Sequence, residues 1–369
     1  MAVNVPDVDC DFTYEKIFDC GDAGPQPVGV GHDAVTDVAA QVAPLAATAL
    51  GDQVPPLGYR FTADTELAIN VALAARRPLL VRGEPGCGKS TLAPAVAKVA
   101  GWDFLSVTVT SRTRAQDLLW TFDAIRRLRD AQAGQGRVGR HPTGARLVGT
   151  QRSGPERSSS PRLKTGGFGA AAIENLRRYV RPGVFWWALA PENAAAVHGG
   201  IPPTGPRDRA VLLLDEIDKA EPDVPNDLLA PMGTLSFEVT DLDGHTVRHE
   251  RAYAPLIVVT TNEERDLPPA FVRRCVVLSL EFPTEDGLVD IGRRHFPGVD
   301  EDLLEQAATV TGTARKEALA ASAQPPGTAE YLDAVRAATG LGVTPGGTPR
   351  EWERIRRLTL AKWARPERA

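Results

Sequence analysis

The feature that most constrains this chain is a glycine-rich loop between an apolar run and an alanine-rich segment. The loop consists of Gly83, Glu84, Pro85, Gly86, Cys87, Gly88, Lys89 and Ser90, followed by Thr91. Residues 78–81 favour a short strand and residues 92–99 favour a helix, so the loop joins a strand to a helix. Its glycines let backbone N–H groups curl around phosphate oxygens, which the lysine can also reach, and the serine hydroxyl suits Mg²⁺. The segment therefore predicts a phosphate-binding loop that opens an α/β domain.

A second apolar run, residues 210–214, ends in the acid pair Asp215 and Glu216. A continuous apolar run of this kind is typical of a central strand in a parallel sheet. Functional groups of such sheets gather at the carboxyl ends of the strands. We therefore expect Asp215 to hold Mg²⁺ and Glu216 to polarise an attacking water molecule.

Two further groups of polar residues accompany buried strands. Asn262 follows the apolar run 255–261, where its amide can hydrogen-bond a terminal phosphate or the attacking water. Arg273 and Arg274 stand just before another apolar run, residues 276–280. A strand that is about to be buried does not need a guanidinium pair at its entrance. The pair is therefore a candidate for binding a phosphate or a carboxylate.

The order of these parts resembles that of the AAA+ ATPases, and more narrowly of the MoxR-type branch, over about residues 57–365. The resemblance implies an α/β P-loop domain with a five-stranded parallel sheet in the order 5-1-4-3-2, and a small helical lid. It implies that Asn262 is the sensor-one residue. It also implies that Arg274, aided by Arg273, is an arginine finger, because both follow the segment Leu267-Pro268-Pro269-Ala270. The sensor-two arginine of the lid resembles Arg350. There Thr348, Pro349 and Glu351 would cap and begin the last helix.

Changes in composition along the sequence divide the chain into three regions. Residues 1–56 form an acidic, partly disordered extension, residues 57–282 the large nucleotide-binding subdomain, and residues 283–369 the helical lid. Residues 1–60 hold nine acidic residues and two basic ones. Residues 131–166 hold seven basic residues and one acidic one, so we interpret 131–168 as a flexible insertion. That insertion could be a solvated loop, a partner for the acidic extension, or a nucleic-acid contact, although it lacks aromatic residues before Phe168.

The remaining segments give more local expectations. Residues 61–77 and 117–130 favour helices, and residues 104–110 favour a strand. The pair Asp243-Gly244 favours the turn of a hairpin. The cluster Phe185-Trp186-Trp187 favours core packing over a role in gripping a substrate.

Bulk properties exclude several classes of protein. The net charge of −5 gives no general reason to expect nucleic acid as a partner. No apolar run is long enough to span a membrane, the acidic start is unlike a signal peptide, and the four cysteines lack zinc or disulfide-framework spacing. We therefore expect a cytoplasmic protein.

The sequence thus predicts a Mg²⁺-dependent ATPase that forms a homo-oligomeric ring, such as a hexamer. What is known of MoxR-type proteins implies a chaperone-like remodeller of a partner protein, for example one with a von Willebrand A domain. ATP is preferred over GTP because no guanine-recognition motif of the form NKxD is present. Two alternatives remain open. One is a nucleotide-gated signalling switch, which would retain ADP with little turnover. The other is a nucleic-acid-remodelling motor, which would depend on the basic insertion.

Overall fold

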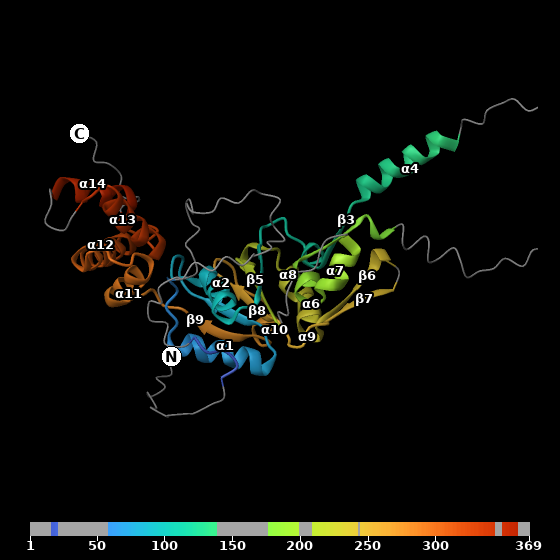
Figure 1. The fold of residues 1–369 in the computed structure, drawn as a ribbon, viewed down its shortest axis with the longest axis horizontal. Coiled ribbons are helices and arrows are strands. Elements are labelled where there is room, and N and C mark those ends of the chain that lie inside the picture. Colours follow the sequence, from blue (N-terminus) through green and yellow to red (C-terminus); the bar gives the residue numbers. More distant parts are fainter. Residues whose placement is uncertain are drawn as a thin grey trace, which may run out of the picture.

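The computed structural model describes residues 16–20, 58–138, 176–198, 209–242, 244–343 and 349–360. Its centre is a five-stranded parallel sheet in the order β2-β5-β8-β1-β9 (Figure 1). The strands are β1 (Leu79–Arg82), β2 (Asp103–Thr108), β5 (Ala210–Asp215), β8 (Leu256–Thr260) and β9 (Val276–Ser279). Counted along the chain, this is the order 5-1-4-3-2, so the predicted fold class is confirmed.

The alternation of side chains along the strands makes a core on each face of the sheet. Leu79 and Val81 belong to one buried cluster, and Leu80 belongs to the other. The first cluster includes residues of α1 (Ala63–Ala75) and α2 (Lys89–Ala100). The second includes residues of α3 (Ala115–Leu119), α6 (Val184–Leu189) and α7 (Pro191–His198). Helices therefore cover both faces, as expected where parallel strands are apolar throughout.

The aromatic cluster belongs to the second core. The side chains of Phe185 and Trp186 are fully buried in α6, and Trp187 packs partly buried against the same cluster. This placement agrees with the core-packing interpretation of the cluster.

Shorter elements complete the α/β domain. They are the helices α8 (Asp223–Asp227), α9 (Leu229–Thr234) and α10 (Pro269–Val272), and the ribbon of β6 (Ser236–Val239) and β7 (His245–Arg248). The ribbon was predicted. Of the predicted turn pair, Asp243 lies outside the described residues, and Gly244, with a φ angle of 78°, lies in the connection between the two strands. Strand β6 ends at Val239, and a 3-10 turn over Thr240–Leu242 begins the connection.

The predicted helix over residues 117–130 is wrong, because a short strand interrupts it. Strand β3 (Trp120–Phe122) lies between α3 and α4 (Ala124–Val138) and pairs with β4 (Val180–Pro182). The Trp120 ring stacks on Phe237 at 5.8 Å, and its Nε1 donates to Asp241 Oδ2 at 2.9 Å. These tertiary contacts override the local helical preference.

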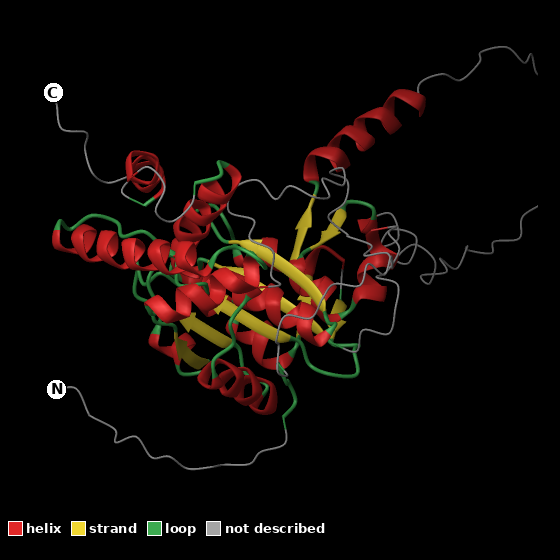
Figure 2. Cartoon of the chain, turned by 60° about the vertical axis from the view of Figure 1, so that its left-hand side comes forward, coloured by secondary structure: helices red, strands yellow, loops and turns green. Residues whose placement is uncertain are grey.

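Helix α4 projects from the body of the molecule (Figure 2). It continues through Val138, so the first residues of the predicted insertion 131–168 are helical. Most of that insertion, and most of the predicted extension 1–56, lies outside the described residues.

The lid is helical, as expected. It contains α11 (Glu285–His295), α12 (Glu301–Ala320), α13 (Thr328–Gly340) and α14 (Pro349–Thr359). The predicted cap residue Thr348 lies outside the described residues, although α14 does begin at Pro349. In the part of the chain that the structure describes, we find no helix with the length and apolar character needed to cross a membrane.

A short piece of the acidic extension packs into the α/β domain, which the sequence did not predict. Phe18 is 2% exposed and lies 5.5 Å from Phe61 and 6.4 Å from Trp102, measured between ring centroids. Asn70 of α1 accepts hydrogen bonds from the backbone N–H groups of Ile17 and Phe18, at 2.7 and 2.8 Å, and donates to the Phe18 carbonyl. Phe18 therefore belongs to the core of the domain, and residues 16–20 are anchored to it through this side chain and Asn70.

We predict that Phe18→Ala lowers the free energy of unfolding by about 3–4 kcal/mol, because it leaves a cavity among aromatic rings. Urea denaturation measures this loss. Ile17→Ala is the control, since Ile17 is 45% exposed and should change the stability by less than about 1 kcal/mol. Equal effects of the two substitutions would show that residues 16–20 do not pack as described.

Candidate nucleotide site

The glycine-rich loop lies at the carboxyl end of β1 and encloses the start of α2. Three of its glycines have positive φ angles: Gly83 (143°), Gly86 (84°) and Gly88 (97°). A Cβ atom at Gly83 would lie 2.3 Å from the Leu280 carbonyl oxygen, so a side chain does not fit there. The loop therefore requires glycine for its backbone conformation and for its close packing on the chain that follows β9.

Lys89 is held inside the curve of this loop. Its Nζ donates to the carbonyl oxygens of Gly83, at 2.6 Å, and Glu84, at 2.9 Å, and the residue is 6% exposed. The ammonium group is thus placed where phosphate oxygens could replace the carbonyl groups as its partners.

Asp215 connects three elements at the end of β5. Its Oδ1 atom accepts from the Ser90 hydroxyl of α2 at 2.8 Å and from the Thr260 hydroxyl of β8 at 2.6 Å. A hydroxyl and a carboxylate oxygen in contact form a donor set that suits Mg²⁺, which prefers oxygen ligands. The residues present therefore fit the expected metal.

Glu216 has a left-handed backbone conformation, with φ 59° and ψ 48°. Its backbone N–H donates to the Thr260 hydroxyl at 2.9 Å, and its Oε2 pairs with Lys219 Nζ at 2.9 Å. That conformation is costly for a residue with a side chain and is found most often at functional sites. The hydrogen bond to Glu216 raises the pKa of Lys219.

The loop after β8 carries Asn262 and is fixed by a buried acid. Asp218 is 3% exposed, and its Oδ2 accepts from the backbone N–H groups of Asn262, at 3.1 Å, and Glu264, at 3.0 Å. The sequence alone did not indicate this role of Asp218 or the bridging role of Thr260. An acid three residues after Asp215 and a threonine at the end of β8 were the available signals.

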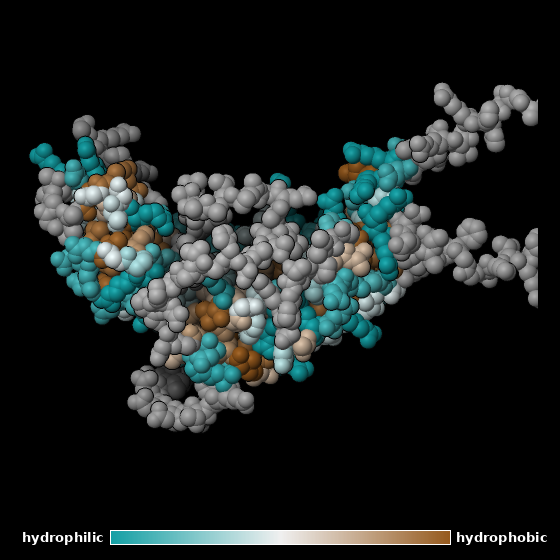
Figure 3. All heavy atoms as spheres, viewed as in Figure 1, coloured by the Kyte–Doolittle hydropathy of each residue, from teal (hydrophilic) through white to brown (hydrophobic). Residues whose placement is uncertain are grey.

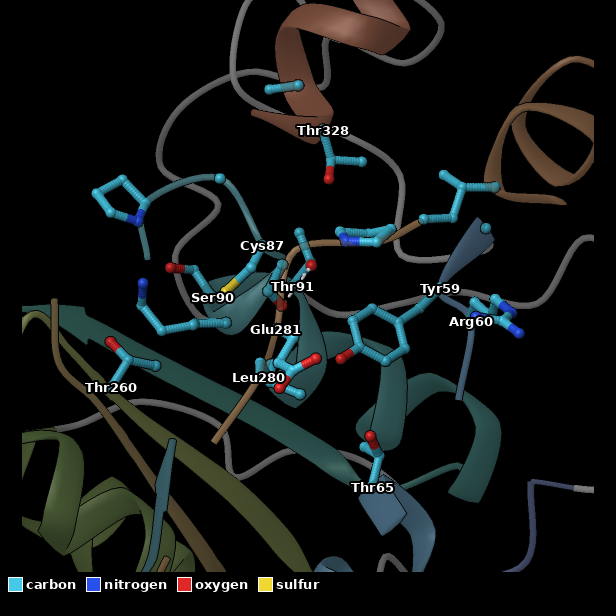
Figure 4. Close-up of a pocket in the computed structure, with 18 of the residues that line it drawn as sticks. Tyr59, Arg60, Thr65, Cys87, Ser90, Thr91, Thr260, Leu280, Glu281 and Thr328 are labelled. Carbon is cyan, nitrogen blue, oxygen red and sulfur yellow. Dashed lines mark hydrogen bonds between the residues drawn. The ribbon is translucent and has the colours of Figure 1, made fainter. Parts of the chain in front are cut away.

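These groups face one cavity of about 420 Å³ between the α/β domain and the lid (Figure 4). Among the residues predicted for the site, the lining includes Pro85 through Thr91, Asp215, Glu216 and Asn262. The lid contributes Ile291, His295, Thr328, Ala329 and Leu332, and the start of the domain contributes Gly58, Tyr59 and Arg60. The lining therefore combines polar groups of the loop and of the strand ends with apolar and aromatic side chains.

Burial keeps several lining groups neutral. It raises the pKa of Tyr59 and of the Cys87 thiol, and it lowers the pKa of His295. Cys87 therefore stays a protonated thiol, which is a poor nucleophile, so its burial favours a packing role in the loop.

Three of the predicted arginines lie outside this cavity. Arg273 and Arg274 are exposed at the end of α10, beside the amino end of β9, whereas the cavity lies at the carboxyl ends of the strands. Arg350 is exposed in the first turn of α14, so the structure does not bring it to the nucleotide site as expected. Helix α13 of the lid does approach the loop: the Thr328 N–H donates to the Gly86 carbonyl at 3.0 Å.

Comparison with known proteins gives a partial match. Residues 78–147 match the family model described as AAA domain (dynein-related subfamily). Midasin of Giardia intestinalis is 37% identical over 65 residues, which are 16% of this chain and 1% of that protein, so the chain spans about 1% of the length of this relative. A proline-to-glycine mutant of RuvB from Thermotoga maritima matches with a TM-score of 0.35 and 14% identity, over 76% of this chain and 69% of that one.

The matched segment contains the phosphate-binding loop. Together with the strand order, it identifies the α/β domain as a P-loop AAA+ fold. None of the three descriptions names the MoxR-type branch.

We predict that Thr260→Val lowers the free energy of unfolding by about 1–3 kcal/mol, because it leaves the partly buried N–H of Glu216 without its acceptor and removes a donor to Asp215. Thr260 is 1% exposed and valine has nearly the same shape, so packing changes little. Thr260→Ser retains the hydroxyl and is the matched control for this bond. Urea denaturation in which valine proved as stable as the wild type would refute the bridging role.

Proposed function

We propose that this chain is a Mg²⁺-dependent AAA+ ATPase of the MoxR type, which assembles into a ring and remodels a partner protein. The observation that carries the proposal is the meeting of the phosphate-binding loop, the Ser90–Asp215 pair, Glu216 and Asn262 in one cavity. Each of these groups has a distinct use in the transfer of a phosphoryl group to water.

The cavity suits a nucleoside triphosphate that carries a metal ion. The loop N–H groups and Lys89 would bind the phosphates, and the walls formed by Tyr59, Ile291 and Leu332 suit the flat faces of a nucleobase. Ser90 and Asp215 would hold Mg²⁺, which when bound offsets negative charge on the phosphates. The proposal specifies ATP on the sequence argument alone.

The residues of the chain divide the hydrolytic work. Glu216 accepts a proton from the attacking water, and Asn262 orients that water or the terminal phosphate. The backbone N–H groups of Glu216 and Asn262 donate hydrogen bonds to Thr260 and Asp218, which fix the backbone of these two residues. The groups are thus held in place before nucleotide binds, which lowers the reorganisation needed for reaction.

The positions of Arg273 and Arg274 favour action on a second copy of the chain. Both are exposed at the edge of the sheet formed by β9, far from the cavity of their own chain. Apolar side chains are exposed on β9 and on α1: Val277 of β9 is 43% exposed, and Leu67 and Val71 of α1 are 45% and 43% exposed. Figure 3 shows hydrophobic side chains at the surface in the region where Figure 1 draws α1. A contact that uses two different surfaces either closes into a ring or keeps growing, and the proposal is a closed ring such as a hexamer.

The proposal also includes a biological role. A chaperone-like action in the cytoplasm, on a protein such as one with a von Willebrand A domain, rests on the resemblance to the MoxR-type branch. A nucleotide-gated switch would instead retain ADP with little turnover. A nucleic-acid motor would lose its measured affinity for DNA when residues 131–166 are deleted. Steady-state turnover and DNA binding at low salt therefore separate the three functions.

Glu216→Gln should bind ATP but hydrolyse it roughly 10²–10⁴-fold more slowly, because the amide cannot accept the proton from water. Phosphate release measures turnover, and titration with a fluorescent ATP analogue measures affinity. Lys89→Ala is the complementary variant, which should lose binding itself. Wild-type turnover in Glu216→Gln would refute the role given to this residue.

Mixed assemblies test the arginine finger. Arg274→Ala should reduce turnover roughly 10³-fold, because a finger stabilises charge that develops in the transition state. Mixing it with Glu216→Gln should restore part of the hydrolysis, since some interfaces then join an intact Arg274 to an intact Glu216. Native mass spectrometry must show that the two variants co-assemble. Co-assembly without any recovery of turnover would contradict a finger supplied by the neighbouring chain.

A further inference from the structure

The lid touches the phosphate-binding loop at two adjacent points of the loop tip. At the first, Gly86 meets Gly327, just before α13: a Cβ atom on Gly86 would lie 2.5 Å from the Gly327 Cα. The Thr328 N–H donates to the Gly86 carbonyl across this contact. Two facing glycines therefore let the backbones of the lid and the loop pack directly on each other.

The second point is an ion pair between Arg315 of α12 and Glu84 of the loop. The guanidinium group donates through Nη2 to Glu84 Oε2 and through Nη1 to the Pro326 carbonyl, at 3.2 Å. It also lies 4.0 Å above the centre of the Phe282 ring, in the segment that leads into the lid. The side chain of Arg315 is only 10% exposed, so several contacts fix its position.

Arg315 contacts three separate segments of the chain and so links them to one another. Pro326 precedes α13, Phe282 follows β9, and Glu84 belongs to the loop. Burial lowers the pKa of Arg315, which reflects the cost of removing a cation from water, and Glu84 offsets part of that cost. Helices α11 and α13 form one wall of the cavity through Ile291, His295 and Leu332, so a residue that fixes the lid also fixes that wall.

We propose that Arg315 is the positioning residue that fastens the lid to the phosphate-binding loop through Glu84, and that this contact sets the affinity for nucleotide. The inference rests on the proposed nucleotide site and adds a specific role for the lid. It differs from the sensing role expected of Arg350 in one respect. Arg315 binds the tip of the loop rather than a terminal phosphate, so it affects ADP and ATP alike.

The test compares Arg315→Met with Arg336→Met in the full-length chain. Methionine keeps the apolar stem of Arg315 against Phe282 but removes the charge. Arg336 is a matched control, because it also lies on the lid, pairs with an acid (Asp333, at 2.9 Å) and stands over a ring (Phe296, at 5.8 Å), but it does not contact the loop. Affinities for fluorescent ADP and for a non-hydrolysable ATP analogue, together with melting temperatures, are the measurements.

Arg315→Met should weaken the binding of both nucleotides by roughly tenfold, the effect of losing one charge-assisted contact. The free protein should keep its melting temperature if the charge left behind can reach water, because the loss of one ion-pair partner is strongly destabilising when it leaves a buried charge. Glu84, 58% exposed, satisfies that condition. Glu84→Gln should weaken binding similarly, and the double variant should be no weaker than either single one. Arg315→Lys should recover part of the affinity.

Each contrary result is informative. Equal affinities for wild type and Arg315→Met would overturn the inference, as would a loss confined to ATP or one matched by Arg336→Met. These results assume a wild type that binds nucleotide in a Lys89-dependent manner. A wild type that binds neither nucleotide, or a Lys89→Ala variant that binds normally, would instead overturn the proposed function.

Discussion

The carboxylate of Asp215 is the interaction on which the arrangement of the site depends. One of its oxygen atoms accepts hydrogen bonds from hydroxyl groups of α2 and β8. Three segments that are distant in sequence therefore meet at a single acid. The Thr260 hydroxyl that donates to Asp215 also accepts the N–H of Glu216. These contacts hold the carboxyl ends of the strands together. They also fix the groups that are proposed to bind metal and to activate water, so the same hydrogen bonds specify the sheet and the site.

The parts that the sequence predicted correctly are those with a local physical cause. Strands β5 and β8 are apolar runs that end at polar residues, and burial on both faces requires that pattern. The glycines of the loop are fixed by positive φ angles that other residues adopt only at a cost. Asp215, Glu216 and Asn262 could be assigned because the carboxyl ends of parallel strands meet at one edge of the sheet. Their precise partners, Thr260 and Asp218, required the register between strands.

The parts that the sequence did not predict depend on contacts between distant segments. Phe18 lies in an acidic stretch without a strand or helix pattern, yet Asn70 and a group of aromatic rings hold it in the core. Trp120 lies in a helical pattern but pairs as a strand, because its ring stacks on Phe237. Arg350 has good local helix-start signals, whereas Arg315, in the middle of α12, has none. Only the fold of the lid shows which arginine faces the loop.

Arg315 and Arg274 make or offer contacts at opposite ends of the sheet. Under the proposed function, Arg315 acts on nucleotide affinity within one chain, and Arg274 acts on turnover between chains. Arg315 reaches the loop of its own chain, at the carboxyl end. Arg274 is separated from that end by β9, about 13 Å of extended chain, which exceeds the reach of its side chain. Under the proposed function, a single chain therefore holds the groups that bind nucleotide, but its Arg274 cannot reach its own site. Affinity would be set within one chain by the lid, whereas turnover would be set between chains, so nucleotide can be retained before assembly and hydrolysed only after it.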